Sequence, residues 1–177
     1  MGLRDAISGW GATAAERATP LACDELVPDP KTVLVPAVDV DAPRALVYRW
    51  LCQLRLAPYS YDWIDNGGRR SPQELTPGAD DLEQGQRMVS VFRLAQFEPE
   101  RHLTLEQWGS LLGQVALTYL VSDRGEKGSR LVLRIAWGPP RVPGARALLS
   151  AGDLVMARRQ LLNLKRLAER DANRVRV

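Results

Sequence analysis

Four stretches in the middle of the chain have the composition of β-strands, rich in β-branched and large apolar residues. They are residues 88–97, 103–108, 115–121 and 131–137. In the last two, large apolar side chains alternate with smaller or polar ones, as at Leu117, Tyr119 and Val121. Such alternation predicts an antiparallel sheet with one face buried. The polar residues 124–128 predict the turn that joins these two strands.

A first stretch with helical spacing precedes these strands. It follows Asp41-Ala42-Pro43, where an acid that accepts backbone amides and a proline of fixed φ favour a helix start. The helix is expected to end near residue 55. Its apolar positions are Leu46, Val47, Trp50, Leu51 and Leu54. This spacing predicts one buried side.

The longest predicted helix runs from about residue 153 to residue 170, after the breakers at 138–144. Its apolar side consists of Leu154, Met156, Ala157, Gln160, Leu161, Leu164, Leu167 and Ala168. Its other side carries Arg158, Arg159, Lys165, Arg166 and Arg170. We expect the leucines to face the concave side of the sheet and the arginines to face water.

The segments around these elements are less regular. Residues 33–40 read as a further strand, in which Pro36 predicts an edge position or a bulge. Residues 59–86 predict a short helix or turn and then a surface loop. We divide the chain into an N-terminal arm (1–31) with one helical turn near residues 12–17, a single domain (32–172) and a tail (173–177). Strands grouped between helices indicate the α+β class.

Composition and charge restrict the kind of protein. The chain has 177 residues, 45% of them hydrophobic and 25% charged, as in ordinary globular proteins. No apolar run approaches the roughly 18 residues of a membrane helix, and the first ten residues have no secretory apolar core. We therefore expect a cytoplasmic protein without stable membrane insertion. The oligomeric state is left open.

The net charge of +3 is unevenly distributed, because residues 158–177 hold seven bases and two acids. This basic face lacks interleaved aromatic residues, so a solvated outer surface is favoured and no nucleic-acid partner is expected. Cys23 and Cys52 lie far apart and are expected to be buried or inert thiols. With a single histidine they cannot complete a structural zinc site. No metal and no cofactor is expected.

Several short motifs follow one another in a characteristic order. They are Asp39-Val40-Asp41-Ala42-Pro43 with Val47-Tyr48-Arg49-Trp50-Leu51, Tyr59-Ser60-Tyr61-Asp62-Trp63, Gly85-Gln86-Arg87, Phe97-Glu98-Pro99, Ser129-Arg130-Leu131, and Met156-Ala157-Arg158-Arg159 with Leu164-Lys165. In this order the chain resembles START-like proteins of the SRPBCC superfamily, of the polyketide cyclase/dehydrase type. The resemblance spans about residues 33–170, and Trp10-Gly11-Ala12-Thr13 and Asp24-Glu25-Leu26 extend it into the arm.

The resemblance implies a helix-grip fold, in which a curved antiparallel sheet wraps around the last helix. It also implies a cavity between them for a lipid, polyketide, hormone or other apolar molecule. In one place the sequence departs from the family, because residues 88–97 contain no Gly, Asn or Pro where two strands are commonly separated by a clear turn. This predicts a shortened or tight hairpin.

The expected ligand site combines the inward positions of the strands with the last helix. The expected cavity walls are Leu117, Tyr119, Leu133, Ile135, Trp137, Met156 and Gln160. Tyr61 and Trp63 are expected at the mouth, because aromatic residues before a loop offer apolar area to a flat ligand. An equal alternative is that these aromatic side chains fill the core below the loop. Gln160, an amide in an apolar stripe, needs hydrogen-bond partners. A bond to a strand backbone or a position at the rim is favoured over a ligand or a cavity water.

Two other functions remain open from the sequence. One is an enzyme of the cyclase, aromatase or dehydratase type, in which Tyr61, His102 or an acid moves a proton; the acids considered are Asp62, Asp65, Glu106 and Asp123. The other is an interaction module with a filled core that uses the arm and the basic helix. No serine-hydrolase elbow, phosphate loop or HExxH motif is present, and His102 between charged turn residues is expected to be a surface histidine.

Overall fold

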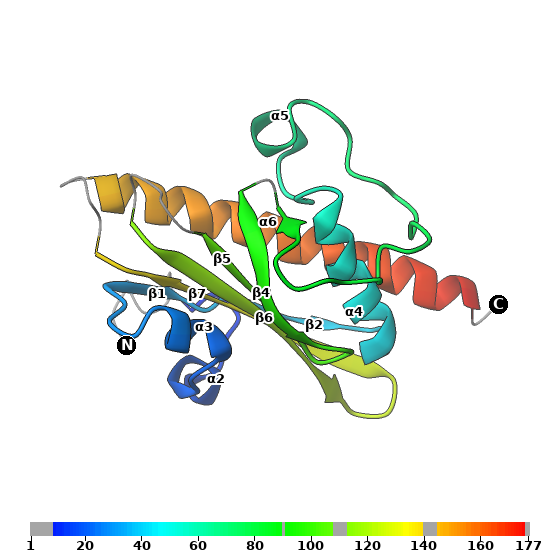
Figure 1. Ribbon diagram of the computed structural model, residues 1–177. Coiled ribbons are helices and arrows are strands. Elements are labelled where there is room, and N and C mark those ends of the chain that lie inside the picture. Colours follow the sequence, from blue (N-terminus) through cyan, green and yellow to red (C-terminus); the bar gives the residue numbers. More distant parts are fainter. Residues whose placement is uncertain (1–8, 90, 108–112, 140–144, 176–177) are drawn as a thin grey trace.

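A seven-stranded antiparallel sheet and a long C-terminal helix form the framework of the computed structural model (Figure 1). The structure describes residues 9–89, 91–107, 113–139 and 145–175; for residues 145–151, 153 and 175 it describes only the backbone. The strands follow the order β1-β7-β6-β5-β4-β3, and β2 also pairs with β7. Their bounds are β1 Thr32–Leu34, β2 Ala37–Val40, β3 Arg87–Met88, β4 Phe92–Glu98, β5 His102–Gln107, β6 Val115–Arg124 and β7 Gly128–Trp137.

Helices cover both faces of this sheet. Their bounds are α2 Ala14–Ala18, α3 Ala22–Leu26, α4 Arg44–Cys52, the 3-10 turn η1 Gln53–Arg55, α5 Asp62–Asp65 and α6 Ala145–Val175. In Figure 1, α6 runs along one face together with α4, and the short helices α2 and α3 lie on the other. The α+β class and the helix packed along the sheet are as predicted.

The amphipathic pattern of α6 is confirmed. Leu161 and Leu167 are fully buried and Leu154 is partly buried, whereas Arg158 and Arg166 are exposed. The helix is longer than predicted: it begins at Ala145 and not near residue 153, and it includes residues 173–175 of the predicted tail. A glycine inside a helix, as at position 152, costs only about 1 kcal/mol relative to alanine, so it does not stop the helix.

The strand expected over residues 33–40 is interrupted at Pro36. Both halves pair with β7, so the break falls in an edge segment, as a proline without an N–H requires. The carbonyl of Pro36 still accepts a hydrogen bond from the Leu133 amide, at 2.9 Å. The prediction of an edge position or a bulge is confirmed.

Asp41 does not have the capping role predicted for it. The N-cap residue of α4 is Pro43, which has no side chain that can accept a hydrogen bond. Asp41 instead binds Arg124 through its carboxylate, and its backbone amide donates to Glu169 on α6. A carboxylate two residues before the cap reaches the end of the sheet rather than the first helical turn, so this part of the prediction is wrong.

The run 88–97 is not one strand but a short hairpin. Arg87 pairs with Arg93 and Met88 with Phe92, so the chain reverses between β3 and β4. Val89 has a φ of 41°, which is rare for a β-branched residue. Its amide donates to the Leu54 carbonyl at 2.9 Å. A tight hairpin without a turn-forming residue is what the sequence predicted here.

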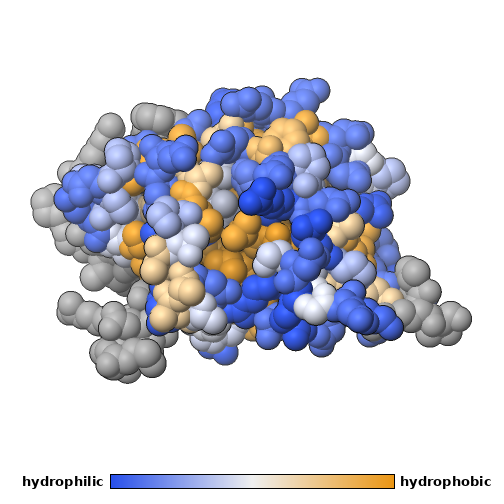
Figure 2. Space-filling model, turned by 90° about the horizontal axis from the view of Figure 1, so that it is seen from below, coloured by the Kyte–Doolittle hydropathy of each residue, from blue (hydrophilic) through white to orange (hydrophobic). Residues whose placement is uncertain are grey.

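The part of the N-terminal arm that carries α3 packs against the sheet face opposite to α6. The amide of Cys23 donates to the hydroxyl of Thr118, at 3.0 Å, and Cys23 and Val27 pack on Ala116 and Ala136. Cys23 and Cys52 are both buried free thiols, as expected. Seen from below, on the side of the arm, the surface is mostly hydrophilic around an apolar area near its centre (Figure 2).

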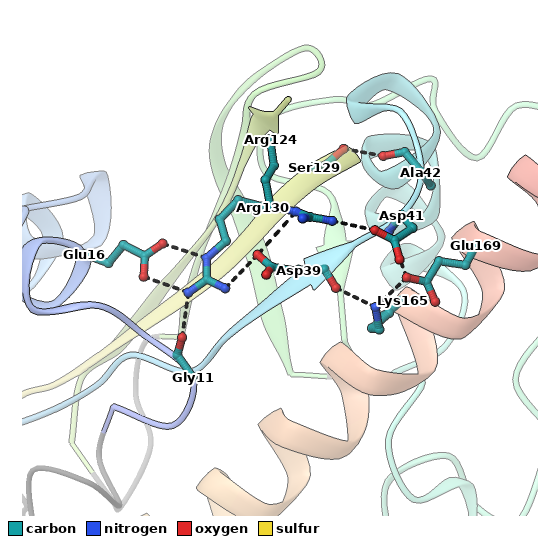
Figure 3. Close-up of polar contacts among 10 residues, drawn as sticks. All are labelled: Gly11, Glu16, Asp39, Asp41, Ala42, Arg124, Ser129, Arg130, Lys165 and Glu169. Carbon is teal, nitrogen blue, oxygen red and sulfur yellow. Dashed lines mark hydrogen bonds and ion pairs between the residues drawn. The ribbon is translucent and has the colours of Figure 1, made fainter. Parts of the chain in front are cut away.

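Arg130 on β7 connects the arm to β2 through ion pairs and hydrogen bonds. Its guanidinium donates to both carboxylate oxygens of Glu16, at 2.7 and 2.8 Å, to Asp39 at 3.1 Å and to the Gly11 carbonyl at 2.6 Å (Figure 3). Gly11 has a φ of 72°, and a Cβ at this position would lie 2.2 Å from the carbonyl oxygen of Ala37. Only glycine fits this contact without a shift of the backbone.

Candidate functional site

A cavity of about 450 Å³ lies between the concave face of the sheet and α6. Strands β6 and β7 supply one wall, since residues two apart on a strand point to the same face. Helix α6 supplies the opposite wall. The lining residues are Pro58, Ser60, Asp65, Val89, Val91, Phe92, Gln107, Val115, Leu117, Tyr119, Leu133, Ile135, Trp137, Met156, Ala157 and Gln160. Most of this lining is apolar.

Seven of the nine residues predicted for the ligand site line this cavity. They are Leu117, Tyr119, Leu133, Ile135, Trp137, Met156 and Gln160. The strand register explains why they meet, because Leu117 pairs with Ile135 and Tyr119 with Leu133 across β6 and β7. Cross-strand partners have their side chains on the same face of the sheet.

Gln160 connects both walls through its buried amide. Its carbonyl oxygen accepts a hydrogen bond from the Tyr119 hydroxyl at 2.5 Å, and its nitrogen donates to the Pro58 carbonyl at 2.6 Å. Burial raises the pKa of Tyr119, so this hydroxyl stays protonated and acts as the donor. Gln160 is thus satisfied by protein groups, but they are a side-chain hydroxyl on β6 and a loop carbonyl, not the strand backbone or rim position that the sequence favoured.

Two polar features of the lining have no clear signal in the sequence. Ser60 donates a hydrogen bond to the carboxylate of Asp65, and both side chains border the cavity. At another point of the lining, the indole Nε1 of Trp137 is buried without a hydrogen-bond partner among the described residues. An unpaired buried donor costs free energy, and a ligand acceptor would remove that cost.

The two residues predicted for the cavity mouth lie elsewhere. Tyr61 and Trp63 border a second pocket of about 370 Å³ on the outer side of residues 59–61, and neither lines the cavity. Trp63 is 76% exposed, whereas the neighbouring aromatic residue Tyr59 is buried. Thus Tyr59 belongs to the core, and Trp63 projects from the short helix α5.

We expect Trp63→Ala to change the free energy of unfolding by less than about 0.5 kcal/mol, because an exposed side chain has few packing contacts to lose. Urea unfolding of both proteins measures this difference. We also expect unchanged binding of an apolar probe in the cavity. A loss of stability above about 2 kcal/mol, as for a core residue, would contradict the exposed position.

The other candidate proton-transfer groups lie away from the cavity. His102 begins β5, and its partial burial lowers the pKa of the imidazole; its Nδ1 is 3.8 Å from a carboxylate oxygen of Glu98. It is therefore less solvated than expected. Asp62 accepts hydrogen bonds from the amide and hydroxyl of Ser71, and Asp123 pairs with Arg44. Glu106 does not line the cavity.

No group of three or more potential metal ligands occurs among the residues that the structure describes. In the same part of the chain, no helix has the length and apolar character to cross a bilayer.

A seven-stranded antiparallel sheet packed along a long C-terminal helix is the helix-grip arrangement of START-like proteins, so the predicted fold is confirmed. One similar solved structure is the two-domain aromatase/cyclase (ARO/CYC) BexL from the BE-7585A biosynthetic pathway. It is 20% identical with a TM-score of 0.53, over 78% of this chain and 46% of that one. The present chain thus spans less than half of BexL.

Two smaller proteins also have this fold. MLL2253 from Mesorhizobium loti is 16% identical with a TM-score of 0.51, over 78% of this chain and 98% of its own. XoxI from Bacillus cereus is 15% identical with a TM-score of 0.50, over 77% and 95%. No family model matches the sequence, and no curated protein matches it. At these identities the likeness concerns the fold.

Proposed function

We propose that this protein binds a small apolar molecule, such as a lipid or a polyketide, in the cavity between the sheet and α6. The observation that carries the proposal is the size and lining of the cavity. Its volume of about 450 Å³ lies within the roughly 300 to 1,000 Å³ of small-molecule sites. This volume supports a ligand-binding role over an interaction module with a filled core. Residence in the cytoplasm and the absence of a nucleic-acid partner belong to the same proposal.

Binding in such a cavity would depend mainly on burial of apolar surface. Each Å² removed from water contributes roughly 25 cal/mol before ordering costs. The cavity offers a ligand few hydrogen-bonding groups, since the amide of Gln160 is already bonded to Tyr119 and Pro58. Polar groups of the lining that could orient a ligand include the Trp137 indole, the Ser60–Asp65 pair and the Gln107 amide. Selectivity should therefore follow shape more than hydrogen bonding.

The alternative, an enzyme of the cyclase, aromatase or dehydratase type, needs a proton-transfer group beside the ligand. Asp65, one of the candidate acids, borders the cavity together with Ser60. A carboxylate beside a bound ligand is a group that can move a proton. Native mass spectrometry of the freshly purified protein would identify a retained ligand. Conversion of that compound during incubation would favour the enzyme over the binding protein.

We expect Met156→Trp to weaken binding of an environment-sensitive apolar fluorophore at least about tenfold, because the larger ring occupies the cavity. Met156 lines the cavity and is partly exposed, so the change is better tolerated than one in the closed core. The matched control is Val155→Trp, on the same helix at a position 54% exposed to solvent. Equal affinities of the two folded variants would place the probe outside the cavity.

A further inference from the structure

A second pocket, of about 370 Å³, lies between the segment that carries α5 and the outer side of α6. In contrast to the cavity, its lining is mainly polar. The lining residues are Tyr59, Ser60, Tyr61, Asp62, Trp63, Arg70, Ser71, Gln73, Arg159, Asn163, Arg166 and Leu167. Three guanidinium groups therefore border one small space, two from α6 and one from the loop after α5.

The positive charge of this pocket is not balanced by the protein. Asp62 is the only carboxylate among the lining residues, and its two oxygens accept hydrogen bonds from the amide and hydroxyl of Ser71, at 2.8 and 2.5 Å. Arg166 donates to the amide oxygen of Gln73 at 3.1 Å. Within the described part of the chain, neither Arg159 nor Arg70 forms an ion pair.

Other bases of the same helix differ in this respect. Lys165 pairs with Glu169 at 2.5 Å, and Arg174 pairs with Glu74 at 3.0 Å. Arg170 contacts the carboxylates of both Glu74 and Asp171. Lys165, Arg170 and Arg174 therefore have carboxylate partners, whereas the guanidiniums that border the pocket form no ion pair among the described residues. Like charges that share a pocket repel one another, and a bound anion removes that repulsion.

Aromatic rings complete the pocket. The guanidinium of Arg159 lies over the ring of Tyr61, with its carbon 5.9 Å from the ring centroid, which restrains the side chain beside the pocket. Trp63 also borders the pocket and is 76% exposed. An exposed indole beside unpaired guanidiniums offers a flat apolar surface next to positive charge.

We propose that this pocket binds the phosphate group of a small organic phosphate, with Arg159, Arg166 and Arg70 as its ligands and Trp63 beside the organic part. Guanidinium groups match phosphate in geometry as well as in charge. The site is distinct from the apolar cavity, and its test does not require an occupied cavity. Ser60 borders both spaces, so the phosphate belongs either to the headgroup of the cavity ligand or to a separate compound.

The probe is phenyl phosphate, titrated into the full chain by isothermal calorimetry at constant ionic strength. We expect Arg159→Gln to weaken binding about tenfold, the effect of losing one charge-assisted contact. The matched control Arg69→Gln removes the same charge next to Arg70 but outside the pocket, and we expect less than a twofold change. No saturable binding to the parent protein, or equal losses in the two variants, would overturn the proposal.

A second comparison distinguishes the two sources of the phosphate. If it is the headgroup of the cavity ligand, we expect dodecyl phosphate to bind more tightly than phenyl phosphate, and Met156→Trp to abolish that difference. If it belongs to a separate compound, the affinity for phenyl phosphate is the same with and without Met156→Trp, and the dodecyl chain adds nothing. Either result supports the phosphate site. The phosphate-free fluorophore tests the cavity independently, so a failure of one proposal is distinguishable from a failure of the other.

Discussion

Replacing Arg130 by methionine is expected to lower the free energy of unfolding by about 2 to 4 kcal/mol at pH 7, below the full cost of breaking a buried ion pair. The side chains of Arg130 and Glu16 are 17% and 22% exposed, so their charges are only partly screened by water. The variant leaves the Glu16 carboxylate and the Gly11 carbonyl without the guanidinium that binds both. Urea unfolding monitored by circular dichroism measures the loss.

The control is Arg124→Met at the same sheet edge. Arg124 pairs with Asp39 and Asp41, but its side chain is 43% exposed. Exposed ion pairs contribute roughly 0 to 1 kcal/mol, so the expected loss is below about 1 kcal/mol. Equal losses in the two variants would show that Arg130 is only one more surface charge and that the arm is not held by it.

The same ion pair predicts a dependence on pH. Hydrogen bonds from Arg130 lower the pKa of Glu16 from 4.5 to about 2. A carboxyl group whose pKa is lowered by folding stabilises the protein fully above its unfolded value, and this contribution disappears as the pH falls through the folded value. The contribution of Glu16 is therefore complete above about pH 4.5 and is lost toward pH 2. In Arg130→Met the decline in stability over this interval should be smaller.

Gln160→Met is expected to destabilise the protein by about 2 to 3 kcal/mol, although it makes α6 more apolar. The Tyr119 hydroxyl and the Pro58 carbonyl would both lose a buried partner, and an unsatisfied buried polar group costs about 1 to 3 kcal/mol. Tyr119→Phe removes the donor to the Gln160 carbonyl oxygen, while the Gln160 nitrogen still donates to Pro58. Because one buried group loses its partner instead of two, this variant should cost less, about 1 to 2 kcal/mol.

The double variant Gln160→Met/Tyr119→Phe tests this explanation. Because Tyr119 no longer has a hydroxyl to satisfy, we expect the combined loss to be smaller than the sum of the single losses by about 1 kcal/mol. Urea unfolding of the parent protein, the two single variants and the double variant measures the four free energies of this double-mutant cycle. Additive losses would mean that the hydroxyl and the amide do not depend on each other, and that the cost of Gln160→Met lies in packing.

Periodicity along the chain predicted the cavity walls well. Alternation placed Leu117 and Leu133 on one face of the sheet, and helical spacing placed Met156 and Gln160 opposite to them. These are local rules, and they hold because the strands and α6 are long enough to repeat them. A five-residue helix such as α3 is too short to show a period, so the sequence did not reveal it.

Contacts between distant segments could not be predicted in this way. Nothing near Arg130 indicates that its partner is Glu16, 114 positions earlier. The position of Trp63 outside the cavity mouth has a similar cause. Tyr59 takes a left-handed backbone conformation, with a φ of 56°, and turns into the core, which leaves Trp63 outside. Sequence order alone does not determine how a loop turns between two pockets.

The partners of the arm lie far along the chain, and this affects when the arm can dock during synthesis. Helices α2 and α3 are synthesised early, but the guanidiniums that bind Glu16 and Asp24 belong to Arg130 and Arg134 on β7. A ribosome adds roughly 5 to 20 residues per second, so several seconds pass between the synthesis of the arm and the synthesis of β7, to which it binds. Until then Cys23 and Val27 are without the strands that bury them. Closure of the arm is thus a late event in folding during translation.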